Sequence, residues 1–165
     1  MPSANPNWAR WVFASVATYL KEVARQANIP VLVEGLDERT DALMKAKDRC
    51  EVRISGPFSR ELSHNYFRLE VDVNVLFYTR LDESKNRYGI LKTIGDFQEA
   101  MDCNIPVYKY GDEPGDDETA SIGCLAPRSG RNDSIRVLHF GQIDPTDRLK
   151  QSMVDARYVM ELQDN

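Results

Sequence analysis

The sequence has few residues of the kinds that carry chemistry. Its three cysteines, Cys50, Cys103 and Cys124, are widely and unequally spaced, so they predict neither a disulfide framework nor a paired zinc-ligand motif. The only histidines, His64 and His139, show no metal-ligand spacing with a cysteine or with each other. There is no glycine-rich phosphate loop and no nucleophile-elbow serine. We therefore expect no enzyme activity, no cofactor and no metal, and we interpret Cys50 and Cys124 as small buried residues.

Membrane and nucleic-acid signals are also missing. No stretch approaches the roughly 20 apolar residues that span a bilayer, and the first residues do not form a secretory signal. The net charge is −5 and the basic residues are scattered, which removes the usual electrostatic drive for binding DNA. We expect one domain over residues 1–165, because 42% hydrophobic residues suffice for an ordinary core. A reducing cytoplasm fits the cysteine content.

The most regular pattern in the chain lies at residues 67–78. It alternates apolar with polar residues, which is the two-residue period of a β-strand. The apolar set comprises Phe67, Leu69, Val71, Val73, Val75 and Phe77, and the polar set comprises Arg68, Glu70, Asp72 and Asn74. We predict that the apolar set covers a core and that the polar set faces a neighbouring subunit or a channel.

Glu70 and Asp72 would stand about 7 Å apart on that strand, a spacing that also suits an acid–base carboxylate pair. Arg68 and Asn74 flank them. Such a mixed row is typical of a solvated or subunit-facing sheet surface, so we prefer that interpretation. His139 lies in a strand pattern and is interpreted as a hydrogen-bonded structural histidine.

Helical periodicity occurs in two segments. The first begins near Pro6, with Asn5 as the expected cap, and its apolar residues recur at three- and four-residue intervals to about Ala27. The second covers about residues 88–102. Each ends in Asn-Ile-Pro-Val, at residues 28–31 and 104–107. The echo indicates either a duplication or a shared way of leaving a helix and entering an edge strand.

The remaining segments favour β structure. Residues 49–55 alternate and should pair antiparallel with the strand at 67–78, through a long projecting loop at 56–65. Residues 135–142 and 152–162 are further predicted strands, whereas 36–47 is either a short helix or a loop. Runs of strands grouped together predict an α+β fold, with an antiparallel sheet and two helices packed on one face.

Residues 110–134 show neither period and are rich in Gly, Asp, Glu, Ser and Pro. Long loops of this kind are usually functional or disordered. The acidic run could supply oxygen ligands to calcium, but its spacing does not match an EF-hand loop and Pro114 interrupts it. We predict a loop insertion that docks a partner, with these candidate residues: Asp112, Glu113, Asp116, Asp117, Arg128 and Arg131.

The order of these elements resembles that of the tail terminator proteins of long-tailed bacteriophages, and of the tail-completion and neck proteins related to them. The segments that carry the resemblance are Arg-Leu-Glu-Val-Asp-Val-Asn-Val-Leu-Phe at residues 68–77 and Val-Asp-Ala-Arg-Tyr-Val-Met-Glu-Leu at residues 154–162. The resemblance covers about residues 8–162. It implies a small α+β virion protein that closes the tail tube as a ring, commonly a hexamer, and joins it to the head connector.

The same resemblance implies the partners. They are further copies of the chain, the tail tube protein and the head–tail connector proteins, with assembly in the host cytoplasm and a final place in the virion neck. DNA would pass through without tight binding, which suits an acidic protein. The family has no catalytic motif to transfer. The competing hypotheses are another neck, head-completion or protein-binding assembly module, and, with least support, a small enzyme.

Overall fold

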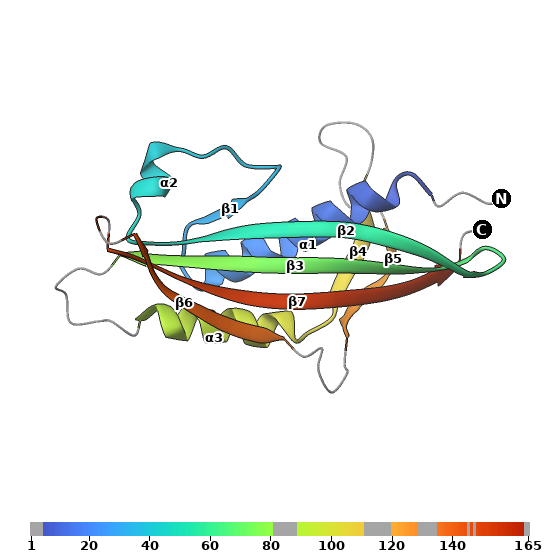
Figure 1. Cartoon of the computed structure of the whole chain (residues 1–165). Helices are drawn as coiled ribbons and strands as arrows, with labels where there is room; N and C mark the ends of the chain where they lie inside the picture. Colours follow the sequence, from blue (N-terminus) through green and yellow to red (C-terminus); the bar gives the residue numbers. More distant parts are fainter. Residues whose placement is uncertain are drawn as a thin grey trace.

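The computed structural model describes residues 5–80, 89–110, 120–128, 135–144, 146 and 148–163. Within these residues, three helices accompany a seven-stranded sheet (Figure 1). The helices are α1 (Trp8–Gln26), α2 (Asp41–Lys45) and α3 (Gly89–Met101). The strands are β1 (Val31–Val33), β2 (Asp48–Ser63), β3 (Tyr66–Arg80), β4 (Ile105–Lys109), β5 (Ala120–Pro127), β6 (Arg136–Asp144) and β7 (Leu149–Gln163).

The strand order is β1-β2-β3-β7-β5-β4, and β6 also pairs with β7. The fold is α+β, as the grouping of the strands predicted. The prediction of an antiparallel sheet is wrong for one strand, because β1 runs parallel to β2. The two strands are parallel because the connection between them, which contains α2, carries the chain back to the end of the sheet at which β1 begins.

β3 lies in the middle of the sheet and is paired along nearly its whole length, with β2 on one side and β7 on the other. Its predicted register is confirmed. Val71 and Val73 are completely buried, whereas Glu70 and Asp72 are only partly buried and point to the opposite face. The apolar face of β3 therefore forms the floor of the core.

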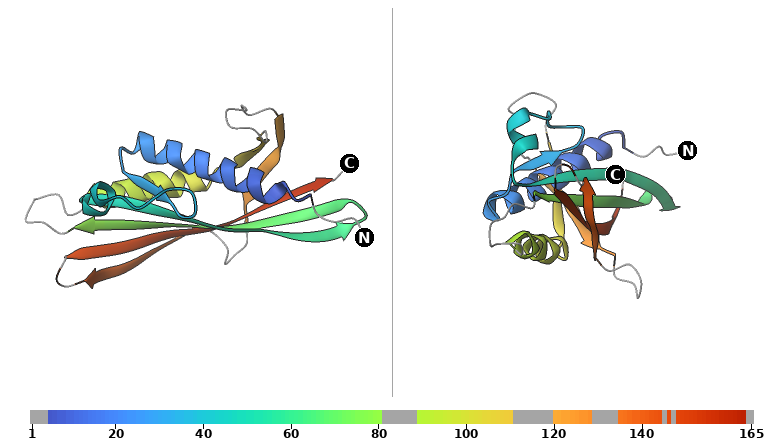
Figure 2. Two further views of the ribbon diagram at one scale, coloured as in Figure 1. Left: turned by 90° about the horizontal axis from the view of Figure 1, so that it is seen from above. Right: turned by 60° about the vertical axis from the view of Figure 1, so that its left-hand side comes forward.

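Both long helices pack over this floor (Figure 2). Two edge-on aromatic contacts anchor them at opposite ends of β3. The ring centroid of Trp8 in α1 lies 5.1 Å from that of Phe67, and the centroid of Phe97 in α3 lies 5.0 Å from that of Phe77. Such contacts add to the free energy of burying large rings. The opposite face of β3 carries polar side chains from Arg68 to Asn74 and, beyond them, Leu76 and Tyr78, which are buried in a second, small apolar cluster.

The start of α1 differs from the prediction. The helix begins at Trp8 with Asn7 as its N-cap, and the Asn7 side chain makes no capping hydrogen bond. Asn5 stabilises the turn before the helix. Its Oδ1 accepts a hydrogen bond from the Asn7 backbone N–H at 3.0 Å, and its carbonyl accepts one from Trp8 N–H at 3.1 Å. Pro6 thus lies in the turn that precedes the helix.

The predicted long loop at residues 56–65 is wrong. β2 continues through this segment and turns into β3 only at His64 and Asn65. A bulge between Ser55 and Phe58 accommodates Gly56, whose φ of +107° favours glycine. Gly-Pro suggested a turn, but pairing with β3 keeps the chain extended across it.

The predicted loop at residues 110–134 is also wrong in part, because it contains β5. This strand pairs antiparallel with β4 and, at Ala126 and Pro127, with β7. Only Leu125 of β5 is buried, so the strand lacks the alternation that would have revealed it. Residues 111–119 and 129–134 lie outside the described part of the chain.

The Asn-Ile-Pro-Val echo leads into β1 after α1 and into β4 after α3. These two strands stand at the two ends of the strand order. Pro30 and Pro106 lack a backbone N–H, which is tolerated at the outer edge of a sheet and not inside it. The placement fits the interpretation of a shared route from helix to edge strand.

Replacing Val73 with Asp should lower the free energy of unfolding by more than about 3 kcal/mol, because the change buries an unpaired carboxylate in the core. Asp72→Asn on the neighbouring, partly exposed position is the matched control and should cost less than about 1 kcal/mol. Urea denaturation of the two variants measures both values. A control that unfolds more readily than Val73→Asp would contradict the register.

Candidate functional site

The face of the sheet that points away from α1 and α3 carries the predicted site residues. Because β2, β3 and β7 pair antiparallel in register, its side chains lie in rows that cross the strands. We call this surface the charged face. Its members are Arg53, Arg60, Arg68, Glu70, Asp72, Asn74, Arg128, Arg136, Asp155, Arg157 and Glu161.

The two carboxylates predicted from β3 are both paired. Arg157 on β7 donates from Nε to Asp72 Oδ1 at 2.6 Å. Arg128, which follows β5, has its Nη1 atom 3.8 Å from Glu70 Oε2. The backbone N–H of Arg128 also donates to the carbonyl of Arg157 at 2.8 Å, which holds the two arginines on adjacent strands. Glu70 and Asp72 therefore do not form a bare acidic surface.

Arg68 belongs to the next row, near the hairpin end. Its Nε donates to Glu161 at 2.9 Å, and Tyr66 Oη donates to the other carboxylate oxygen at 2.7 Å. The hydrogen bond from Arg68, followed by that from Tyr66, holds the pKa of Glu161 below its ordinary value. The same bond to Glu161 raises the pKa of Tyr66. This row keeps its carboxylate ionised at neutral pH.

In the row on the other side, Asn74 stands opposite Asp155 of β7. Asp155 accepts a hydrogen bond from Arg136 Nη2 at 2.6 Å. At the β2 edge of this row, Arg53 Nε lies 2.6 Å from Glu34 Oε2. The charged face thus combines six arginines and four carboxylates from strands far apart in the sequence.

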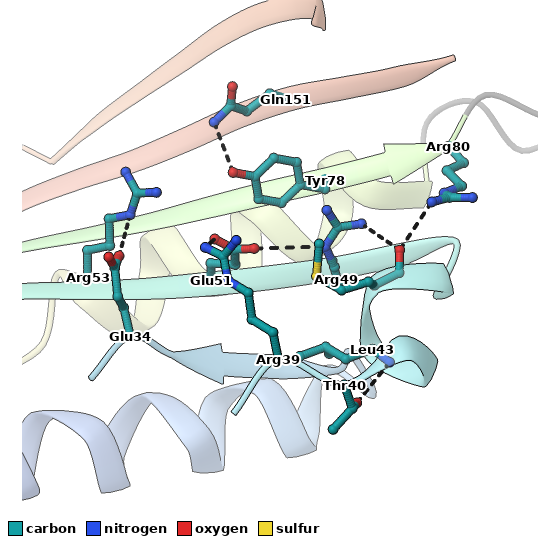
Figure 3. Close-up of polar contacts among 11 residues, drawn as sticks. Glu34, Arg39, Thr40, Leu43, Arg49, Glu51, Arg53, Tyr78, Arg80 and Gln151 are labelled. Atoms are coloured by element: carbon teal, nitrogen blue, oxygen red, sulfur yellow. Dashed lines mark hydrogen bonds and ion pairs between the residues drawn. The ribbon is translucent and has the colours of Figure 1, made fainter. Parts of the chain in front are cut away.

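One end of this side of the sheet holds a buried ion cluster that sequence reasoning missed (Figure 3). Arg49 and Glu51 are only 4% and 3% exposed, although their alternation with Cys50 suggested solvent-facing positions. The Arg49 guanidinium lies 4.5 Å from the centroid of the Tyr78 ring and donates to the Met44 carbonyl at 3.3 Å. The nearby helix α2 supplies that carbonyl, so α2 and the Tyr78 ring both contact Arg49.

Helix α2 resolves the open alternative for residues 36–47 in favour of a short helix. Thr40 caps it, because its Oγ1 accepts from Leu43 N–H at 3.2 Å. Arg80 also donates to the Met44 carbonyl, at 3.1 Å, so two arginines meet at the C-terminal end of the helix. Arginines there interact favourably with the helix dipole. We assign this cluster a structural role in holding α2 against the sheet.

The other candidates show ordinary environments. His139 Nδ1 hydrogen-bonds Ser152 Oγ at 2.8 Å, and burial raises the pKa of the Cys50 thiol to about 12, so it stays protonated at neutral pH. Cys124 is exposed, which corrects the expectation that it is buried. Across the described residues, no group of His, Cys, Asp and Glu could hold a metal ion, and no helix is long and apolar enough to cross a membrane.

The predicted partner-docking loop is only partly described. Asp112, Glu113, Asp116, Asp117 and Arg131 lie outside the described residues. Arg128 belongs to the charged face through its contact with Glu70. The charged face and this end of the predicted loop are therefore one surface.

Comparisons with known proteins establish the fold and no more. No protein-family model and no curated protein matches the sequence. A solved structure that is named only by a catalogue number superimposes with a TM-score of 0.52 and 12% sequence identity. The match covers 95% of this chain and 96% of the other, so the likeness extends over nearly the whole of both chains and concerns the fold alone.

The Glu161 row makes a prediction about pH. The Glu161 carboxyl should titrate below its ordinary pKa, so its contribution to stability is present above the ordinary value and is lost as the pH falls through the folded value. Arg68→Gln should move the pKa of Glu161 upward. Carbon-13 NMR of the carboxyl group measures it. Arg60→Gln in the same row is the control, and an equal change in both variants would contradict the assignment.

Proposed function

We propose that the protein is a structural component of a bacteriophage virion, a tail terminator-like ring that closes the tail tube and joins it to the head connector. The observation that carries the proposal is the charged face, a broad surface of three long strands that the two long helices leave uncovered and on which both charge signs are held in fixed rows. The resemblance in element order supplies the tail context.

A surface of this kind suits contacts between identical subunits. Ion pairs on exposed strands contribute about 0–1 kcal/mol each, so a neighbouring copy can re-pair them at little cost in stability. Complementary charges set which orientation a partner adopts more than how tightly it binds. In a head-to-tail ring, one surface of each copy meets a different surface of the next. The charged face offers the two signs that such a contact needs.

The same surface suits a passage for DNA. Tight binding to DNA requires basic residues gathered so that they displace counterions from the phosphates. On the charged face, Arg68 and Arg157 are committed to carboxylates of their own chain. A passage lined in this way would let DNA move through without a strong grip.

A second candidate is another neck, head-completion or protein-binding assembly module. Strand β6 favours it, because its large apolar residues Leu138, Phe140 and Ile143 are 37%, 52% and 45% exposed. Exposed apolar side chains grouped on one strand mark a surface that another protein covers. Both candidates act by association without turnover of a substrate.

A charge swap on the charged face tests the ring. The double variant Asp72→Arg with Arg157→Asp restores the ion pair within the chain, so the protein should still fold. A neighbouring subunit that recognises the original positions of the two charges should be repelled. Native mass spectrometry should show a ring for the wild type, alone or with its tail tube protein, and a monomer for the swap. The control reverses Lys92 and Asp96, an exposed pair on α3. A monomeric wild type under both conditions would contradict the ring.

Deleting the gene in a phage that encodes it tests the place of the protein in the virion. Electron microscopy should show filled heads and separate tails, some of uncontrolled length. Tails that attach but cannot deliver DNA would keep the neck assignment and change the role to gating. Infectious particles of normal shape, or a tight complex of the purified protein with DNA at physiological salt, would contradict the proposal.

A further inference from the structure

The outer edge of β2 is only partly covered. β1 pairs with it at three positions, and β2 continues for a further eleven residues to Ser63. Cys50 N–H donates to Pro30 O at 2.9 Å, and Val52 O accepts from Glu34 N–H at 2.9 Å. Alternate residues of a strand present their backbone groups to the same edge, so Ile54 presents its N–H and C=O there too. Among the described residues, none pairs with Ile54 on that side.

The chain leaves this edge through a turn that is held in place. After β1, Gly35 adopts a φ of +86°, and Asp37 N–H donates to Val33 O at 2.9 Å. The Asp37 carboxylate accepts from Val33 N–H and from Lys21 Nζ of α1, both at 2.8 Å. The turn therefore fixes where β1 ends, and it leaves Leu36 56% exposed beside the open edge.

A groove of about 560 Å³ runs along α1 and reaches β2 at Gly56, two residues beyond Ile54. Small apolar residues of α1, among them Ala9, Ala14 and Ala17, form one wall, and Leu36 and Gly56 lie on the opposite side. The stretch of α1 from Arg10 to Lys21 is about 16 Å long, which matches about five residues of extended chain. The size falls in the range of ligand-binding clefts in proteins.

We propose that this groove binds an extended segment of another protein. The segment adds a strand to the open edge of β2, in line with β1 and beyond the point at which β1 ends. The segment would pair with the backbone of Ile54 and place alternate side chains against Ala14 of α1. Strand addition of this kind draws affinity from backbone hydrogen bonds and specificity from pockets for alternate side chains. The inference stands independently of the proposed tail role.

The charge of the groove favours an acidic partner. Its two charged lining residues, Arg10 and Lys21, are both basic, and each also has a partner in this chain, the Tyr110 carbonyl for Arg10 and the Asp37 carboxylate for Lys21. They stand near the two ends of the α1 wall. A segment with apolar residues at alternate positions and an acidic residue near one end therefore fits the groove best, because opposite charges at the rim guide docking.

A displayed library of random peptides about nine residues long, enough to span the groove, tests the inference with the full chain as bait. Selected peptides should alternate apolar residues and carry Asp or Glu. Ala14→Phe should weaken their binding by about tenfold or more, because the larger side chain occupies the space in which the apolar side chains of the peptide would lie. Ala9→Phe, at an exposed position of the same wall, repeats the test without a change in the core. The control is Ala42→Phe, on the exposed surface of α2.

Hydrogen exchange measured by NMR supplies an independent readout. A selected peptide should slow exchange of the Ile54 amide in the wild type. It should slow the exchange of this amide equally in the control variant Ala42→Phe. The inference is overturned if no peptide is enriched, or if the enriched peptides bind both groove variants as well as the wild type. It is also overturned if Ile54 becomes protected with rising protein concentration and no peptide, because the occupant would then be a second copy of this chain.

Discussion

The two-residue period of β3 is the constraint on which the rest of the structure depends. Because β2 and β7 pair with β3 in fixed register, its alternation is transmitted to both neighbours, and one side of all three strands becomes apolar. A shift of one residue would exchange the faces of the whole strand. The two long helices can pack on one side only, with Trp8 and Phe97 over the ends of β3. Core and surface are decided together.

The polar side follows from the same constraint. Side chains brought opposite each other by the register form cross-strand ion pairs, such as Asp72 with Arg157 and Arg68 with Glu161. Exposed pairs of this kind add little to the free energy of unfolding. Their consequence is geometric, because they hold charges of both signs at defined positions over a broad surface. That property makes the charged face the basis of the proposed subunit contact.

The edges of the sheet decide where other chains can join it. β1 and β4 are short, and Pro30 precedes β1 while Pro106 lies within β4, so each ends the strand order without a long row of unpaired backbone groups. The far half of β2 is different, because the turn held by Lys21 and Asp37 removes the chain from its edge. An apolar groove beside an open edge is a combination that strand addition requires. The groove lies on the α1 side of the sheet, whereas the charged face points away from α1.

Local patterns in the sequence determined the α+β class, the two long helices and the face on which each residue of β3 lies, because periodicity is a property of neighbouring residues. Tertiary structure decided what those patterns could not express. Pairing with β3 carries β2 through Gly56, and pairing with β4 and β7 makes a strand of residues 120–127. Arg128 reaches Glu70 across β7, because the sheet brings β5, β7 and β3 together, and Arg49 is buried where the Tyr78 ring and the Met44 carbonyl of α2 contact it. Contacts between distant segments produce no periodic pattern among neighbouring residues, so the sequence does not reveal them.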